Sequence, residues 1–206
     1  MNIKRIMDND LSLLMGMSNS AKSSFLYSLI KEYKDKYNGE VYAYGLDHTI
    51  CLMLGVKTFS SLPELELIKG GIVIIDEVKK LIDISDRRNR KQVDNVFRLV
   101  NHKGNKMILS GLPSDFPKYI CAKAKVFMYK SLAITDLING CKAKTHLLDY
   151  KGDGIGNYTL DLPINEVLCY DDGYWNETFK YNEAFDTKKD NPDLFVKKKV
   201  EKKAKK

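Results

Sequence analysis

The sequence predicts an α/β domain in which a largely parallel central sheet is flanked by helices, followed by an irregular C-terminal extension. Apolar runs of strand length alternate with segments whose apolar residues recur at helical spacing, which is the order typical of a parallel sheet. The run 71–75 (GIVII) is rich in β-branched residues, as expected of a strand buried on both faces. A polar turn with a leading glycine follows the first apolar run.

The first half of the chain supplies two predicted strands and three helices. Residues 11–15 (LSLLM) form a short apolar run of strand length. Residues 22–37 carry apolar side chains at helical spacing, and Asn38-Gly39 ends this helix. A second strand is predicted over 41–46, and short helices are predicted over 49–54 and 62–69.

The second half continues the alternation. After the strand at 71–75, residues 92–102 place Val93, Val96, Phe97 and Val100 on one helical face. Further elements are predicted as strands over 106–109 and 125–129, a short helix over 134–138, and a hairpin over 145–150 and 158–160. These elements place a core domain at 1–160, an irregular extension at 161–196 and a basic, disordered tail at 197–206.

The formal charge of +7 is concentrated in the tail. Residues 197–206 hold seven lysines and one glutamate, so they carry +6 and leave +1 for the rest of the chain. Such a segment is too charged to pack into a core. It could contact phosphate backbones, or it could serve only as a solubilising terminus.

Several classes of protein are disfavoured by the sequence. No apolar run reaches the roughly 18 residues that a membrane span needs, and residues 1–10 lack the apolar core of a signal peptide. We therefore expect a cytoplasmic protein, in the host cytoplasm if it is viral. The cysteines form no CxxC pair and are expected to be reduced core residues.

The turn after the first strand matches a phosphate-binding pattern. Residues 16–23 read GMSNSAKS, against G-x-x-x-x-G-K-[ST], with Ala21 in place of the second glycine. Backbone N–H groups of such a turn and the N-terminus of the following helix cradle phosphates, so we expect ATP to bind here. Lys22 is expected at the β- and γ-phosphates, and Ser23 at Mg²⁺. The predicted nucleotide-binding residues are Gly16, Ser18, Asn19, Ser20, Ala21, Lys22, Ser23 and Ser24.

An acidic pair follows the strand at 71–75. Four apolar residues and then Asp76-Glu77 resemble the Walker B motif. The strand places Asp76 at the carboxyl edge of the sheet, where open α/β sheets bind ligands. We expect Asp76 to hold Mg²⁺ and Glu77 to polarise the attacking water. Taken alone, the motif could also be a buried strand that ends in a solvated acidic turn.

Two further catalytic positions are suggested. Ser110 ends the strand after 106–109 and could sense the γ-phosphate, although a simple strand-ending serine fits as well. Arg98 lies on the predicted helix 92–102, where its direction is fixed, and it is the preferred arginine finger among the arginines between Asp76 and Ser110. Each of these arginines could instead be an exposed cation or a DNA contact.

With these residues in order, the chain resembles the additional-strand P-loop ATPases, and within them the FtsK/HerA-like viral DNA-packaging ATPases. The likeness covers residues 9–130, and the segment 93–98 falls where packaging ATPases of small tailed phages carry an arginine finger. It implies a ring of identical subunits that hydrolyses ATP and moves double-stranded DNA, with a capsid or portal protein as a further candidate partner.

Two other functions stay open. The chain could be an ATP-dependent recombination or replication accessory, such as a RecA-like annealing protein or a helicase loader. In that case the aromatic residues Tyr170, Tyr174, Trp175 and Tyr181 could stack on bases, or they could equally cover the edge of the core. A virion-assembly or secretion ATPase that acts on protein is the third possibility.

Overall fold

A single mixed sheet organises the computed structural model, which describes residues 3–82, 86–131, 162–171 and 176–181. Within these residues the strand order is β3-β2-β4-β5-β1-β6-β7-β8. The strands are β1 Leu11–Met15, β2 Val41–Tyr44, β3 Lys57–Thr58, β4 Ile72–Ile75, β5 Lys106–Gly111, β6 Val126–Tyr129, β7 Glu166–Asp171 and β8 Asn176–Lys180. The six strands from β3 to β6 run parallel, which confirms the predicted fold class.

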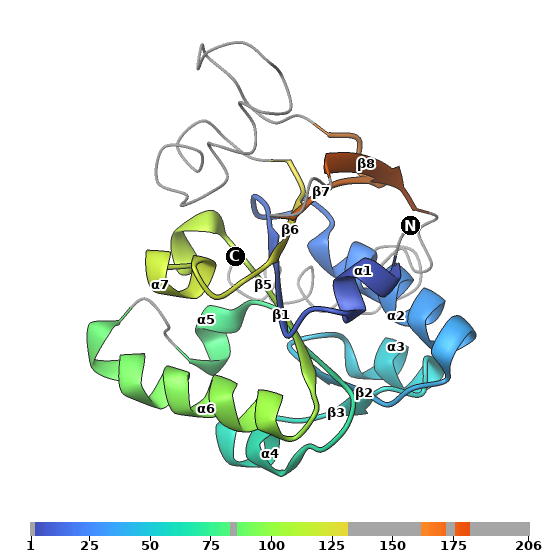
Figure 1. Ribbon diagram of the computed structural model, residues 1–206. Helices are drawn as coiled ribbons and strands as arrows, with labels where there is room; N and C mark the ends of the chain where they lie inside the picture. The colour runs from blue at the N-terminus through green and yellow to red at the C-terminus, as the bar shows by residue number, and fades with distance from the viewer. Residues whose placement is uncertain (1–2, 83–85, 132–161, 172–175, 182–206) are drawn as a thin grey trace, which may run out of the picture.

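Helices cover both faces of the sheet. Figure 1 shows α1, α2 and α3 on one side and α4, α5, α6 and α7 on the other. Their bounds are α1 Ile3–Met7, α2 Lys22–Tyr37, α3 His48–Met53, α4 Leu62–Leu67, α5 Val78–Leu81, α6 Arg90–His102 and α7 Lys118–Cys121, with 3₁₀ turns at Arg87–Asn89 and Pro113–Asp115. Each side has its own apolar core, because alternate strand residues face opposite layers.

The central strands are buried on both faces. Every residue of β1, β4 and β6 is buried, as expected for parallel strands covered by helices on each side. β2 ends at Tyr44, two residues before the predicted end, because Gly45 adopts a left-handed φ of 80°. A Cβ at Gly45 would lie 2.4 Å from the carbonyl oxygen of Asp76, so only glycine fits at this turn.

The C-terminal part of the chain corrects one prediction. Irregular structure was expected over 161–196, but 166–171 and 176–180 form β7 and β8, which extend the sheet in antiparallel fashion beyond β6. The residues Val167, Leu168 and Cys169 are buried in the two cores, so this edge is part of the same packed unit. The division of the chain at residues 160 and 196 stays a prediction.

Several other expectations can be placed against the structure. The predicted helix 134–138, the hairpin over 145–150 and 158–160, and the tail 197–206 lie outside the described residues. Cys51 and Cys169 are buried and take part in no disulfide bond, as expected. Cys121 is disulfide-bonded, so the expectation of a reduced thiol is wrong there. Of the helices in the described ranges, none combines the length and apolarity that crossing a membrane requires.

Candidate functional site

The loop between β1 and α2 adopts an unusual backbone. Asn19 and Ala21 both have a φ of 62°, in the left-handed region that favours glycine. Ala21 caps the N-terminus of α2 with φ 62° and ψ 34°, which explains why glycine is the usual residue at this position of the motif. Turns that contain left-handed residues form the concave backbone nests that bind anions. The loop therefore keeps a phosphate-binding shape despite Ala21.

Close packing fixes the beginning of the loop. A Cβ at Gly16 would lie 2.6 Å from Ser20 Oγ and 2.7 Å from Lys130 Cβ, so a larger residue cannot stand there. Lys22 Nζ donates hydrogen bonds to the carbonyl oxygens of Gly16 at 3.0 Å and Met17 at 2.8 Å. The lysine is thus held across the loop, at the position from which it can reach bound phosphates.

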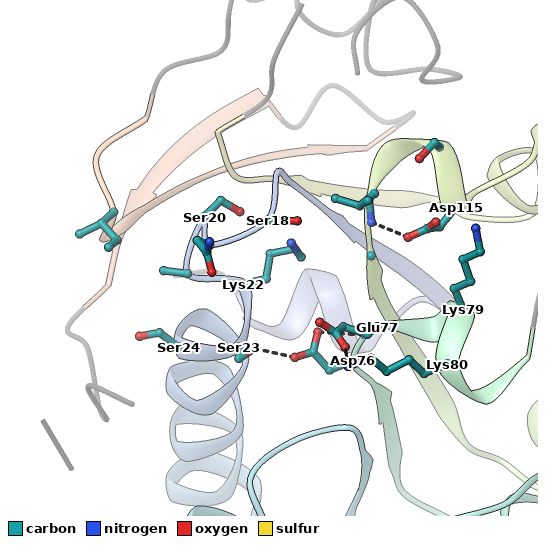
Figure 2. Close-up of a pocket in the computed structure, with 16 residues that line it drawn as sticks. Ser18, Ser20, Lys22, Ser23, Ser24, Asp76, Glu77, Lys79, Lys80 and Asp115 are labelled. Atoms are coloured by element: carbon teal, nitrogen blue, oxygen red, sulfur yellow. Dashed lines mark hydrogen bonds and ion pairs between the residues drawn. The ribbon is translucent and has the colours of Figure 1, made fainter. Parts of the chain in front are cut away.

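Asp76 joins the two motifs. It directly follows β4, is 3% exposed, and accepts a 2.5 Å hydrogen bond from Ser23 Oγ, which Figure 2 shows as a dashed line. Its second carboxylate oxygen accepts the backbone N–H of Glu77 at 3.1 Å. Residues that are 53 positions apart in the sequence therefore meet at the carboxyl edge of the sheet, as predicted.

A cavity of about 800 Å³ opens at this edge. Its lining comes from the loop residues 18–24, from Asp76, Glu77, Lys79 and Lys80, from Gly111, Leu112, Ser114 and Asp115, and from Ile164. Ser20 is one of these lining residues, although its hydroxyl is buried and has no hydrogen-bond partner among the described residues.

The residues present also suit a divalent cation. Asp76 is buried, and no lysine or arginine of the described ranges forms an ion pair with it. A buried carboxylate is unfavourable without a compensating positive charge. Together with the Ser23 hydroxyl, it supplies the oxygen ligands that Mg²⁺ prefers. Ser23 and Asp76 therefore fit the predicted magnesium site.

Glu77 is paired with a neighbouring cation. It has a left-handed φ of 52°, and its carboxylate forms an ion pair with Lys80 three residues along the chain. The hydrogen bond that the Lys80 ammonium donates to the Glu77 carboxylate raises the pKa of Lys80 above its ordinary value. The glutamate side chain is about half exposed and lines the cavity, so it can exchange this partner for water beside a bound phosphate.

The remaining two predicted catalytic residues lie outside the cavity lining. Ser110 is fully buried, pairs in register with Leu14, and its hydroxyl has no partner among the described residues. It follows Leu109, which is paired with Ile75, so it lies beside the strand that leads directly into Asp76. Arg98 is exposed on α6, where its side chain makes no hydrogen bond or ion pair with the described part of the chain.

Sequence reasoning missed several residues of the cavity. Lys79 and Lys80 follow the acidic pair with only one residue between, so their position in α5 was a usable signal. Asp115 is a buried residue of the cavity lining, and its carboxylate accepts the backbone N–H of Leu112 at 2.9 Å. Ile164 carried no local signal, because only the return of the chain to β7 brings it to the cavity.

These features define the fold of a P-loop NTPase, with a Walker A loop after β1 and a Walker B acidic pair after β4 in a largely parallel sheet. No protein-family model and no curated protein matches the sequence.

Solved structures share this fold. The DNA-packaging ATPase B204 of Sulfolobus turreted icosahedral virus matches with a TM-score of 0.61 and 12% identity, covering 83% of this chain and 97% of that one. The genome-packaging NTPase B204 of Sulfolobus turreted icosahedral virus 2, in complex with ATP-gammaS, matches with a TM-score of 0.56 and 15% identity over 87% and 98% of the two chains.

A bacterial protein is also similar. The cytoplasmic domain of the type VII secretion ATPase EccC of Thermomonospora curvata gives a TM-score of 0.54 and 12% identity, covering 88% of this chain and 24% of that one. At these identities the likeness establishes the fold, and residue roles rest on the geometry of the site.

Proposed function

We propose that this chain hydrolyses ATP and uses the energy to move double-stranded DNA during viral genome packaging. The observation that carries the proposal is the likeness over 97% of the length of a viral DNA-packaging ATPase, combined with the meeting of the two Walker motifs at Ser23 and Asp76. The similarity to FtsK/HerA-like ATPases inferred from the sequence supports the same function. The chain thereby belongs, in this proposal, to the class of ring-forming DNA motors.

The site supplies the groups that phosphoryl transfer needs. Lys22 and the loop N–H groups stabilise the charge of the β- and γ-phosphates. Glu77 leaves Lys80, orients the attacking water and receives its proton. The water oxygen bonds to the γ-phosphorus as the bond to the bridging oxygen breaks, giving ADP and inorganic phosphate. Mg²⁺, held by Ser23 and Asp76, would add positive charge at the phosphates.

Arg98 suits a role across a subunit interface. It does not line the cavity of its own subunit, and it is exposed on a helix whose opposite face is buried. Arg88 pairs with Asp86, and Arg90 lies 4.9 Å from the ring centroid of Tyr119, so both have partners within the subunit. An arginine on a helix, with no side-chain partner among the described residues of its own subunit, can complete the site of a neighbouring subunit. This supports a homo-oligomeric ring.

A second candidate is an ATPase that acts on protein, such as a secretion or virion-assembly ATPase. The likeness to EccC favours it. The third candidate, an accessory that stacks single-stranded DNA on aromatic side chains, has less support. Tyr181 is 8% exposed and packs at 5.2 Å against Phe25, so it covers the core edge rather than presenting a stacking surface.

Stimulation of ATP hydrolysis separates these functions. Phosphate release is measured without DNA, with double-stranded DNA and with single-stranded DNA, at matched nucleotide concentration and low salt. Lys22→Ala serves as the inactive control. Stronger stimulation by double-stranded DNA supports the motor. Preference for single-stranded DNA would point to the accessory, and hydrolysis that neither DNA changes would favour a protein substrate.

A further inference from the structure

Ile164 is an exposed apolar side chain in a largely polar cavity. It is 62% exposed and lines the same cavity as the phosphate-binding loop and the acidic pair. Most of the other lining residues are hydroxyl-bearing or charged, which suits phosphates and a cation but not an aromatic ring. Ligand sites combine a few polar groups with apolar surface. We therefore expect Ile164 to contact an apolar part of the ligand.

A buried lysine holds the backbone of Ile164 in place. Lys130 directly follows β6 and is 1% exposed, and its ammonium donates to the carbonyl oxygens of Ile164 at 2.7 Å and Glu166 at 2.5 Å. The Tyr181 hydroxyl donates to the Ile164 carbonyl at 2.8 Å and lies 3.0 Å from the ammonium. A lysine is rarely buried unless its donors are satisfied, so these contacts fix where the Ile164 carbonyl lies.

The same contacts place Ile164 beside the phosphate loop. The Tyr181 hydroxyl lies 3.5 Å from the carbonyl oxygen of Ala21, 160 residues away in sequence. Lys130 packs directly against Gly16 at the beginning of the loop. Ile164 is therefore anchored through Tyr181 to the N-terminus of α2.

The orientation of a bound nucleotide follows from the acidic pair. The γ-phosphate must lie near Glu77, and Figure 2 shows Asp76 and Glu77 on the opposite side of Lys22 from Ser20 and Ser24. The α-phosphate, the ribose and the base then extend away from the acidic pair, past the N-terminus of α2. This is the direction in which Tyr181 and Lys130 hold Ile164.

We propose that Ile164 forms the wall against which the nucleoside of the bound nucleotide packs, with Lys130 and Tyr181 as the residues that position it. The inference rests on the proposed nucleotide site and extends it from phosphate recognition to the nucleoside. It makes the ligand class a nucleoside di- or triphosphate rather than an inorganic polyphosphate, because only the former has an apolar ring to bury.

Two probes separate nucleoside packing from phosphate binding. ADP carries both a nucleoside and a diphosphate, whereas inorganic pyrophosphate carries only the phosphates, and neither is consumed during a titration. Calorimetric titration of Ile164→Ala is expected to show ADP binding about fivefold weaker, with pyrophosphate binding unchanged. Ile164→Leu should restore the affinity for ADP, since it restores the apolar surface.

The neighbouring Asn165→Ala is the matched control, because Asn165 is also exposed but does not line the cavity. It should bind both ligands as the wild type does. If Ile164→Ala binds ADP with wild-type affinity, or loses ADP and pyrophosphate equally, the nucleoside wall is wrong while the ATPase proposal stands. A wild-type protein that binds neither ligand would overturn both proposals.

Discussion

The side chain of Lys22 contacts its own loop and is also expected to bind phosphate. Its ammonium contacts two carbonyl oxygens of its own loop, at Gly16 and Met17, and a bound triphosphate would offer stronger, charged acceptors within reach. At the residue scale, this amine is therefore the group on which nucleotide affinity depends most directly.

Lys22→Ala should abolish nucleotide binding or turnover, since it removes the positive charge from the β- and γ-phosphates. ADP titration and phosphate release measure the two losses. Lys31→Ala removes the same charge from an exposed position on α2 and should leave both unchanged. A Lys22→Ala protein that hydrolyses ATP at the wild-type rate would show that the loop is not a nucleotide site.

The backbone of Ala21 adopts the left-handed conformation, which is less favourable for alanine than for glycine. Ala21→Gly relieves this cost, partly offset by the greater freedom of glycine in the unfolded chain, so we expect a gain in the free energy of unfolding of about 0.5 kcal/mol. Denaturant unfolding measures it.

Asn19→Gly is the control for Ala21→Gly. Asn19 has the same φ of 62°, but asparagine tolerates the left-handed region better than alanine. The gain should therefore be smaller at Asn19. Loss of stability in Ala21→Gly would mean that the Ala21 methyl group contributes packing that outweighs its backbone cost.

At the scale of an element, α4 shows how a short helix is fixed at its beginning. Glu64 accepts hydrogen bonds from the Ser60 hydroxyl at 2.7 Å and amide at 3.0 Å, and from the Ser61 hydroxyl at 3.0 Å. These bonds, led by that of the Ser60 hydroxyl, hold the pKa of Glu64 below its ordinary value of 4.5. The carboxylate thereby closes the turn that leads into the helix.

The lowered pKa of Glu64 makes its stabilisation of the beginning of α4 depend on pH. Because the folded pKa lies below the unfolded one, the stabilisation is fully present above pH 4.5 and is lost as the pH falls through the folded pKa. Glu64→Gln should lower the free energy of unfolding at pH 7, and the difference from wild type should shrink at pH 3. Glu66→Gln, on the same helix and without a side-chain bond to the described residues, should show no such pH-dependent difference.

At the scale of the whole molecule, the site of one subunit is incomplete if Arg98 acts on its neighbour. Arg98→Ala should then bind ADP normally but hydrolyse ATP about 10³- to 10⁵-fold more slowly. Wild-type specific activity should also rise with protein concentration as rings form. Arg88→Ala, which removes an arginine that is paired within its own subunit, should change neither property.

Mixed rings test the same geometry directly. Glu77→Gln lacks the water-orienting carboxylate and Arg98→Ala lacks the finger, so each variant retains a different half of the shared site. Mixing the two inactive proteins should restore measurable phosphate release, because some interfaces regain both halves. No recovery, together with wild-type activity that is independent of concentration, would leave Arg98 as a surface or DNA-contacting cation.

The sequence by itself predicted the positions of the phosphate-binding loop and the acidic pair, and most of the strands of the sheet. The P-loop spacing, the run at 71–75 and the acidic pair are local patterns, and each depends on backbone geometry that neighbouring residues set. The structure brings Ser23 and Asp76 together as predicted, because parallel strands expose their carboxyl ends at one edge. The apolar run 167–169 was a usable signal for β7, but it is too short to separate strand from loop by periodicity alone.

Only the tertiary structure decided what surrounds these motifs. It brings Tyr181 to Ala21 across 160 residues, buries Lys130 beneath Ile164, and leaves Arg98 outside its own cavity. Such contacts depend on which strand pairs with β6 and on how the chain returns to the sheet edge. Local hydrophobic periodicity records which face of an element is buried, but not which distant segment covers it, so these positions could not be read from the sequence.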